Sequence, residues 1–172
     1  MSVKTILTEP NPLLRQISKP VEKVGKEEQQ LMDDMLETMY LANGIGLAAI
    51  QIGVPKRIIV MDISKDENNK EPRYFVNPVI KNRDILKSTY EEGCLSVPNQ
   101  FAEIDRPKKC DVEYLDYNGD KKILKAEGLL ATCIQHEMDH LEGILFIDYL
   151  SKLKKTMIIK KLSKKKSTRI VV

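Results

Sequence analysis

Long apolar runs are missing from this chain of 172 residues, and no stretch approaches the roughly 18 residues that a transmembrane helix needs. The first five residues, Met1 to Thr5, have neither the apolar core of a secretion signal nor the Arg- and Ser-rich character of a transit peptide. We therefore expect no membrane association and a cytoplasmic location, or an organellar one if a presequence has been removed.

Cysteine is scarce: Cys94, Cys110 and Cys133 are an odd number, and none of them is part of a CxxC pair. This argues against a disulfide framework and for a reducing compartment, and it leaves at least one thiol free for chemistry. An apolar fraction of 42% and a charged fraction of 31% are typical of a globular protein. The length fits one compact domain.

Acidic residues are missing after Asp148. Residues 149–172 hold eight lysines and Arg169, a charge of +9, whereas residues 1–148 hold 19 basic and 25 acidic residues, a charge of −6. A lysine-rich helix face is most often only solvated, yet a basic tail on an acidic body also favours contact with RNA. Both interpretations of the tail stay open.

Helices and strands are both expected, because the apolar spacing changes along the chain. Helices are predicted over 26–42, 127–142 and 151–166, after a short turn and helix within 10–17. The last helix should carry an apolar stripe of Leu153, Met157, Ile158 and Leu162. Strands are predicted over 57–63, 74–79, 111–117 and 121–125, the last two joined by the hairpin signal Asn118-Gly119.

The chain contains only two histidines, His136 and His140, and Glu137 directly follows the first. On a helix this spacing places both imidazoles on one face, where they can share a metal ion, with the glutamate beside the open side of that metal as a proton acceptor. The alternative is two surface histidines on an amphipathic helix, although packing needs none of these residue types.

Two histidines need a third ligand, and the downstream sequence offers none. The thermolysin-like pattern needs a helical glutamate about twenty residues further on, but no acidic residue follows Asp148. The metzincin pattern needs a third histidine at the position of Phe146. Both familiar metalloprotease patterns are therefore incomplete in this chain.

A thiolate upstream is the best match for two imidazoles. Cys133 faces the metal side of the predicted helix, but three ligands in a row on one helix fit poorly around a tetrahedral ion. Cys110 lies within a predicted strand and is interpreted as a small buried apolar residue. Cys94 lies on an extended, glycine-flanked turn that can approach the helix from outside, so we favour Cys94 over Cys133.

Three protein ligands leave a metal position open for water, which favours a hydrolytic site over a structural one. A metal ion there would acidify water and polarise a carbonyl, and Glu137 would take the proton and return it to the leaving nitrogen. Suitable donors for the developing oxyanion are the backbone N–H groups around Leu95 and the amide of Gln51, the one polar side chain in an apolar stretch.

Three segments together resemble the peptide deformylase family. The family motif GxGLAAxQ matches residues 44–51, EGCLS matches residues 92–96, and HExDHLxG matches residues 136–143. The likeness covers most of the chain, from the turn at residues 10–15 to about Leu150. It implies an α+β fold in which antiparallel or mixed sheets pack around the central HExxH helix, with a catalytic domain at 1–150 and a basic C-terminal helix and tail at 151–172.

The resemblance also implies a reaction, the removal of the formyl group from the initiator methionine of nascent polypeptides. Cys94, His136 and His140 would hold one metal ion, usually Fe(II) in this family, with Zn or Ni able to substitute. Glu137 would be the general acid and base, while Gln51 and the N–H of Leu95 would bind the formyl oxygen. Residues expected to bind the peptide are Gly44, Ile45, Gly46, Tyr90, Leu129 and Cys133, the first three as a pairing strand and Ile45 with the last three as the methionine pocket.

One position departs from the family pattern. Phe101 stands where well-known bacterial members carry arginine, so a substrate contact made by that guanidinium is in doubt here. Bacterial members with a C-terminal helix are also associated with ribosome binding, which agrees with the basic tail.

Two other classes compete with this hypothesis. A non-enzymatic RNA- or ribosome-binding module with a structural zinc site would need a fourth ligand such as Cys133, and would make Glu137 dispensable. A general metallopeptidase is disfavoured by the missing downstream ligand.

Overall fold

A computed structural model describes residues 2–171 of the chain, and the side chains of residues 2–164. Its α-helices are α1 (Lys26–Leu41), α2 (Gly128–Leu141) and α3 (Lys152–Val171), and its short 3-10 helices are η1 (Pro12–Arg15), η2 (Ala49–Ile52) and η3 (Phe146–Tyr149). Its strands are β1 (Gly46–Ala48), β2 (Ile58–Met61), β3 (Arg73–Arg83), β4 (Lys87–Cys94), β5 (Val97–Pro107), β6 (Lys109–Leu115) and β7 (Lys121–Glu127). The fold is therefore α+β.

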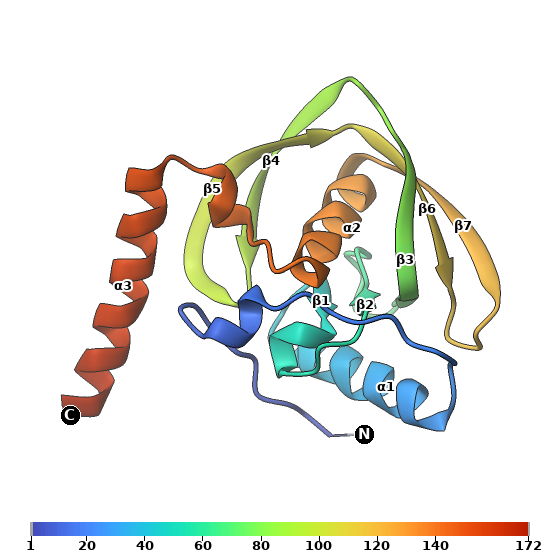
Figure 1. Ribbon diagram of the computed structural model, residues 1–172, viewed down its shortest axis with the longest axis horizontal. Helices are drawn as coiled ribbons and strands as arrows, with labels where there is room; N and C mark the ends of the chain where they lie inside the picture. Colours follow the sequence, from blue (N-terminus) through green and yellow to red (C-terminus); the bar gives the residue numbers. More distant parts are fainter. Residues whose placement is uncertain (1, 172) are drawn as a thin grey trace.

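The strands form two antiparallel sheets. Five strands are ordered β1-β2-β3-β6-β7, and β4 pairs with β5 as a separate hairpin. Figure 1 shows α2 in the middle of the molecule, between the larger sheet and this hairpin. The motif helix can therefore receive side chains from both sheets.

β2 explains how two helices share one sheet. Ile58 and Val60 pack in the core that also contains the methionines of α1, whereas Ile59 and Met61 pack in the core on the side of α2. Alternate residues of a strand point to opposite faces, so a strand covered on both faces needs an unbroken apolar run. The sequence Ile-Ile-Val-Met supplies this run, and all four side chains are fully buried.

A third core lies under the C-terminal segment. It joins Val97 and Ile104 of β5 to Phe146 and Ile147 of η3 and to Leu162 of α3. α3 lies along the outer edge of the molecule, away from both larger cores (Figure 1).

The predicted helices and the hairpin at Asn118-Gly119 are confirmed, with boundaries that differ by a few residues and with α3 extending to Val171. β4 and β5 were not predicted, because their alternating polar residues lack a strong apolar signal. The predicted stripe of α3 is partly wrong. Leu153 and Met157 are 71% and 50% exposed, and the packed residues are Ile158, Ile159 and Leu162. Up to residue 164, where side chains are described, α3 packs against the body of the protein along one narrow side.

Candidate metal centre and active site

Cys94, His136 and His140 meet at one point between the two sheets. α2 presents both histidines on one face, and Cys94 arrives at the end of β4, where the register with β5 is irregular. One potential ligand atom from each residue lies within 4.8 Å of the others, and Cys94 Sγ is 3.3 Å from His140 Nε2. The structure therefore brings together the three residues that the sequence suggested, with Cys94 as the thiol. Cys133 does not belong to this group.

The donor set fits a divalent transition metal. Bond lengths of about 2.0 Å to nitrogen and 2.3 Å to sulfur place tetrahedral donors roughly 3.5 Å apart, close to the Cys94–His140 separation. A thiolate with two imidazoles suits iron, nickel or zinc. The Nδ1 atom of His136 is engaged by a carboxylate, so its Nε2 atom is free to coordinate.

That carboxylate belongs to Glu92. This residue is part of the EGCLS motif, but no role was predicted for it from the sequence. Glu92 Oε1 accepts a hydrogen bond from His136 Nδ1 at 2.8 Å, and the Arg106 guanidinium binds both Glu92 oxygens at 2.7 and 2.9 Å. Although burial opposes ionisation, the hydrogen bonds from His136 and Arg106 keep the pKa of Glu92 below its usual value. The buried pair thus fixes the tautomer and orientation of His136.

The network continues beyond Arg106. Its Nη1 atom lies 2.8 Å from Asp139 Oδ2 on α2, and the Tyr149 hydroxyl donates to the same oxygen at 2.7 Å. Arg106 therefore ties β5 to β4 and to the motif helix. The acidic position in the HExDH motif could have indicated Asp139, but no sequence pattern marked Arg106 or Tyr149.

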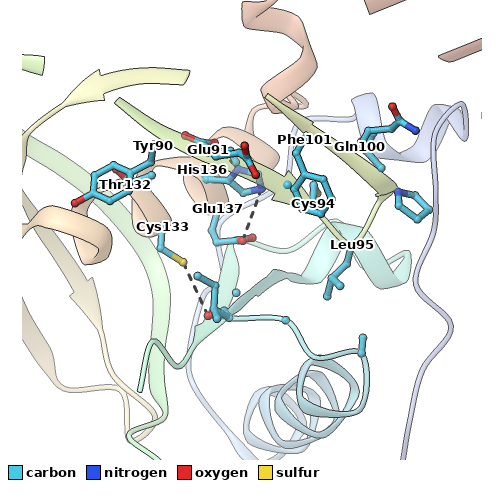
Figure 2. Close-up of a pocket in the computed structure, with 18 of the residues that line it drawn as sticks. Tyr90, Glu91, Cys94, Leu95, Gln100, Phe101, Thr132, Cys133, His136 and Glu137 are labelled. Carbon is cyan, nitrogen blue, oxygen red and sulfur yellow. Dashed lines mark hydrogen bonds and ion pairs between the residues drawn. The ribbon is translucent and has the colours of Figure 1, made fainter. Parts of the chain in front are cut away.

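Glu137 points from α2 toward β1 and the cavity (Figure 2). Its Oε1 atom lies 4.0 Å from His136 Nε2, and its Oε2 atom is buried without a hydrogen-bond partner in the described structure. Burial raises the pKa of the Glu137 carboxyl to about 7, with His136 opposing this and Glu92 reinforcing it. A buried carboxyl beside a metal centre is suited to exchange a proton with a reactant.

Gln51 reaches the same centre from η2. It is 1% exposed, its Oε1 atom accepts from the Ala48 N–H at 2.9 Å, and its Nε2 atom donates to Ser96 Oγ at 3.0 Å. The same Nε2 atom lies 3.6 Å from Cys94 Sγ. The amide of Gln51 is therefore buried and hydrogen-bonded, and its Nε2 atom lies beside the turn that carries Cys94.

A cavity of about 520 Å³ opens beside the metal centre. Figure 2 shows its walls, which are formed by α2, the β4–β5 turn and the segment before β1. All twelve predicted site residues except His140 line it, namely Gly44, Ile45, Gly46, Gln51, Tyr90, Cys94, Leu95, Leu129, Cys133, His136 and Glu137. The cavity therefore joins the predicted peptide-binding residues to the metal centre, below which His140 is fully buried.

Cys133 is a wall of this cavity. Its Sγ atom lies 3.9 Å from the carbonyl oxygen of Ile45, and burial raises the pKa of the thiol well above its usual value. The group stays a neutral thiol, which suits an apolar pocket wall better than a metal ligand.

Comparison with known proteins decides the family. The family model described as "Polypeptide deformylase" matches residues 3–156. The chain belongs to the peptide deformylase family. Over all 172 residues of both chains it is 81% identical to the peptide deformylase of Pelagibacter ubique.

Solved peptide deformylases share the whole fold. The enzyme of Ehrlichia chaffeensis is 45% identical, with a TM-score of 0.94, and the match covers 98% of this chain and 99% of that one. A second structure from this organism, in complex with actinonin, is 48% identical with a TM-score of 0.90, over 96% and 98% of the two chains. Peptide deformylases are metal-dependent enzymes that remove the N-formyl group from nascent peptides, and this chain is such an enzyme. Within residues 2–171, no helix is both long and apolar enough to cross a membrane.

Proposed function

We propose that the deformylation is carried out by Glu137 as the general acid and base at a metal ion held by Cys94, His136 and His140. One observation carries this proposal: the three ligand atoms converge beside a cavity, and the buried Glu137 carboxyl lies next to them. A structural zinc site would need a fourth ligand and would not need a carboxyl group in this position.

Each residue has a defined task in the proposed reaction. When bound, the metal ion supplies a Lewis acid for the formyl carbonyl and makes water more acidic. Glu137 takes a proton from the attacking water and delivers it to the methionine nitrogen as the C–N bond breaks, which releases formate. Gln51 Nε2 and the Leu95 N–H donate hydrogen bonds to the formyl oxygen as negative charge develops on it.

The peptide is proposed to enter along β1. Gly44, Ile45 and Gly46 would pair with the substrate backbone as an added strand, and β1 is the edge strand of the larger sheet, which leaves one of its sides open. The methionine side chain would lie between Ile45, Tyr90, Leu129 and Cys133, all of which line the cavity.

Iron(II) is the proposed metal, with zinc or nickel able to replace it. The donor set suits all three metals, and iron is the one that the family resemblance implies. A half-buried thiolate can be oxidised, so we expect the iron form to be sensitive to oxygen. Anaerobic purification followed by metal analysis should find about one equivalent of iron per chain and a faster loss of activity in air than for zinc-loaded protein. Equal stability of the two forms in air would contradict iron as the metal of the active form.

The decisive experiment measures formate release from a formyl-methionyl peptide with metal-loaded protein. Glu137→Gln should lower kcat by at least about 1000-fold, near the range for loss of a general base, while the metal content stays unchanged. Cys94→Ser should lower metal retention far more than Cys133→Ser, because only Cys94 belongs to the ligand group. Full activity of Glu137→Gln would refute the assigned chemistry, and the reverse order of the cysteine variants would refute the ligand choice.

The C-terminal helix is proposed to contact the ribosome, with residues 1–150 forming the catalytic domain of a cytoplasmic enzyme. Supporting this, α3 carries the exposed residues Lys152, Lys154, Lys160 and Lys161, and none of its described residues lines the cavity. Lysines on an exposed face can neutralise RNA phosphates, and such binding weakens with salt.

Substituting Lys152, Lys154, Lys160 and Lys161 with glutamine tests this contact without removing the packed side of α3. Ribosome co-sedimentation at low salt should fall at least about tenfold, since each lost phosphate contact weakens binding. Formate release from a short peptide should not change. Unchanged, salt-dependent ribosome binding by this variant would contradict the proposal.

A further inference from the structure

Phe101 of β5 is an unusual cavity residue because its side chain remains 64% exposed. It stands directly opposite Gly93 in the β4–β5 register. A Cβ atom at Gly93 would lie only 2.5 Å and 2.6 Å from Cε1 and Cδ1 of the ring. The ring therefore rests on the glycine that precedes the metal ligand Cys94, and Figure 2 shows it beside Cys94 at the cavity.

The neighbours of Phe101 give this part of the cavity its chemical character. No lysine or arginine occurs among the described residues that line the cavity, whereas Glu91, Glu92 and Glu137 do. Of these, Glu91 is exposed to solvent. Glu92 is already paired with Arg106 and His136, so Glu91 is the exposed charge next to Phe101. A carboxylate that binds beside Phe101 would lose hydration, meet the charge of Glu91 and find no lysine or arginine in the lining to pair with.

Further apolar side chains line the same cavity. Ile45 is 44% exposed and Leu95 is half-buried, although both are large apolar residues. Two partly exposed apolar walls facing one cavity gain free energy when a ligand side chain covers them. Leu95 is not among the residues proposed to surround the methionine, so its apolar surface is available to another side chain of the peptide.

We propose that Phe101 determines peptide specificity, because its ring provides an apolar contact surface for a side chain that follows the formyl-methionine. This surface favours apolar over acidic residues at that position of the peptide. This inference rests on the proposed function, because it concerns the peptide held at the same site. It assigns Phe101 to substrate binding, in addition to its packing on Gly93. A hydrophobic contact of this kind discriminates by about 10- to 200-fold.

The test compares peptides that differ only after the methionine. Formyl-Met-X-Ser and formyl-Met-Ala-X, with X as leucine or glutamate, would be assayed for kcat/KM by formate release, using metal-loaded protein of measured metal content. Wild type should prefer leucine over glutamate by about tenfold at one of the two positions. Phe101→Arg should bring this ratio to about one or reverse it, and Phe101→Leu should keep most of it.

Ile123→Arg provides the matched control. Ile123 is also 64% exposed, but it lies on β7 outside the cavity, so the leucine-to-glutamate ratio should equal that of wild type. This control separates a local charge at the cavity from a change in overall charge.

Three results would overturn the inference. One is a wild-type ratio near one at both positions, and another is a shift of the ratio in Ile123→Arg as large as in Phe101→Arg. The third is a Phe101→Arg variant that loses activity equally on every peptide, which would assign the ring only to support of Gly93. Absence of formate release from every peptide would instead refute the proposed function.

Discussion

α2 and α3 are both amphipathic in sequence, yet their surroundings differ completely. α2 has nine buried residues, among them His136, Glu137 and His140, and it contacts both sheets. α3 buries Leu162 and partly covers Ile158 and Ile159, while Leu153 and Met157 stay exposed. The polar groups of α2 are buried among packed side chains that fix their orientation, whereas the charged groups of α3 face solvent.

This difference concerns how polar residues are tolerated. Glu92 and Arg106 are each about 5% exposed, and they are acceptable near α2 because each charge has a partner. Lys152, Lys154, Lys160 and Lys161 of α3 are exposed and need no such partners, since water solvates them. A metal site, which depends on the orientation of its side chains, is therefore suited to α2. A binding surface that depends on net charge is suited to α3.

Shortening one apolar side chain in each helix gives the largest contrast. Ile134→Ala in α2 should lower the free energy of unfolding by about 3 kcal/mol, because Ile134 is fully buried and would leave a cavity. Leu153→Ala in α3 should change it by less than about 0.5 kcal/mol, because that side chain is 71% exposed. Urea unfolding of both variants measures this, and equal effects would show that α3 is packed as tightly as α2.

A second prediction affects the function of α2 without disturbing its packing. A Cβ atom at Gly46 would lie 2.5 Å from Glu137 Oε1, so Gly46→Ala should displace the carboxyl group. The far end of a glutamate can move, and we expect kcat/KM to fall about 30-fold, near 2 kcal/mol, with little change in unfolding free energy.

Gly25→Ala is the control for that substitution. Its Cβ atom would meet only Glu28 Oε2 at 3.6 Å, far from the cavity, so formate release should be unaffected. If Gly46→Ala also left formate release unchanged, the close approach of β1 to Glu137 would have no catalytic importance.

Much of the difference between α2 and α3 could be predicted from the sequence. The contacts that could not be predicted depend on long-range packing. The i and i+4 histidines determine a shared helix face, so His136, Glu137 and His140 could be placed before the structure was known. The missing downstream ligands pointed to an upstream thiolate, and the glycine-flanked turn favoured Cys94 over Cys133. The spacing of the lysines likewise predicted the exposed face of α3.

Long-range pairing could not be predicted. Arg106 is 14 residues from Glu92 and 33 from Asp139 in sequence. Pairing of β4 with β5 in one hairpin brings Arg106 to Glu92, and the contact of β5 with α2 brings it to Asp139. That hairpin was missed because one of its faces is polar and Gly93 interrupts its pattern. The choice between Leu153 and Ile159 as packed residues of α3 also depended on where η3 and β5 lie, which periodicity does not determine.

The smallest predicted effect concerns the attachment of α3 to the body. Asp148 of η3 lies 2.7 Å from Lys155 Nζ of α3 and 2.6 Å from Arg15 Nη1. Burial opposes ionisation, but the hydrogen bonds from Lys155, Arg15 and the Leu145 N–H prevail and lower the pKa of Asp148. The resulting stabilisation is present above the unfolded-state pKa near 4 and is lost as pH falls through the lower folded-state value.

Asp148→Asn should therefore lower the free energy of unfolding by about 1 kcal/mol at pH 7, and the difference from wild type should narrow as pH falls below about 4. Glu113→Gln is the control, because its ion pair with Lys81 is about half exposed on both sides and should contribute almost nothing. Urea unfolding at several pH values measures both variants. If the difference for Asp148→Asn persisted unchanged to pH 3, α3 would be attached by packing and not by charge. α3 would then be held in the same way as α2.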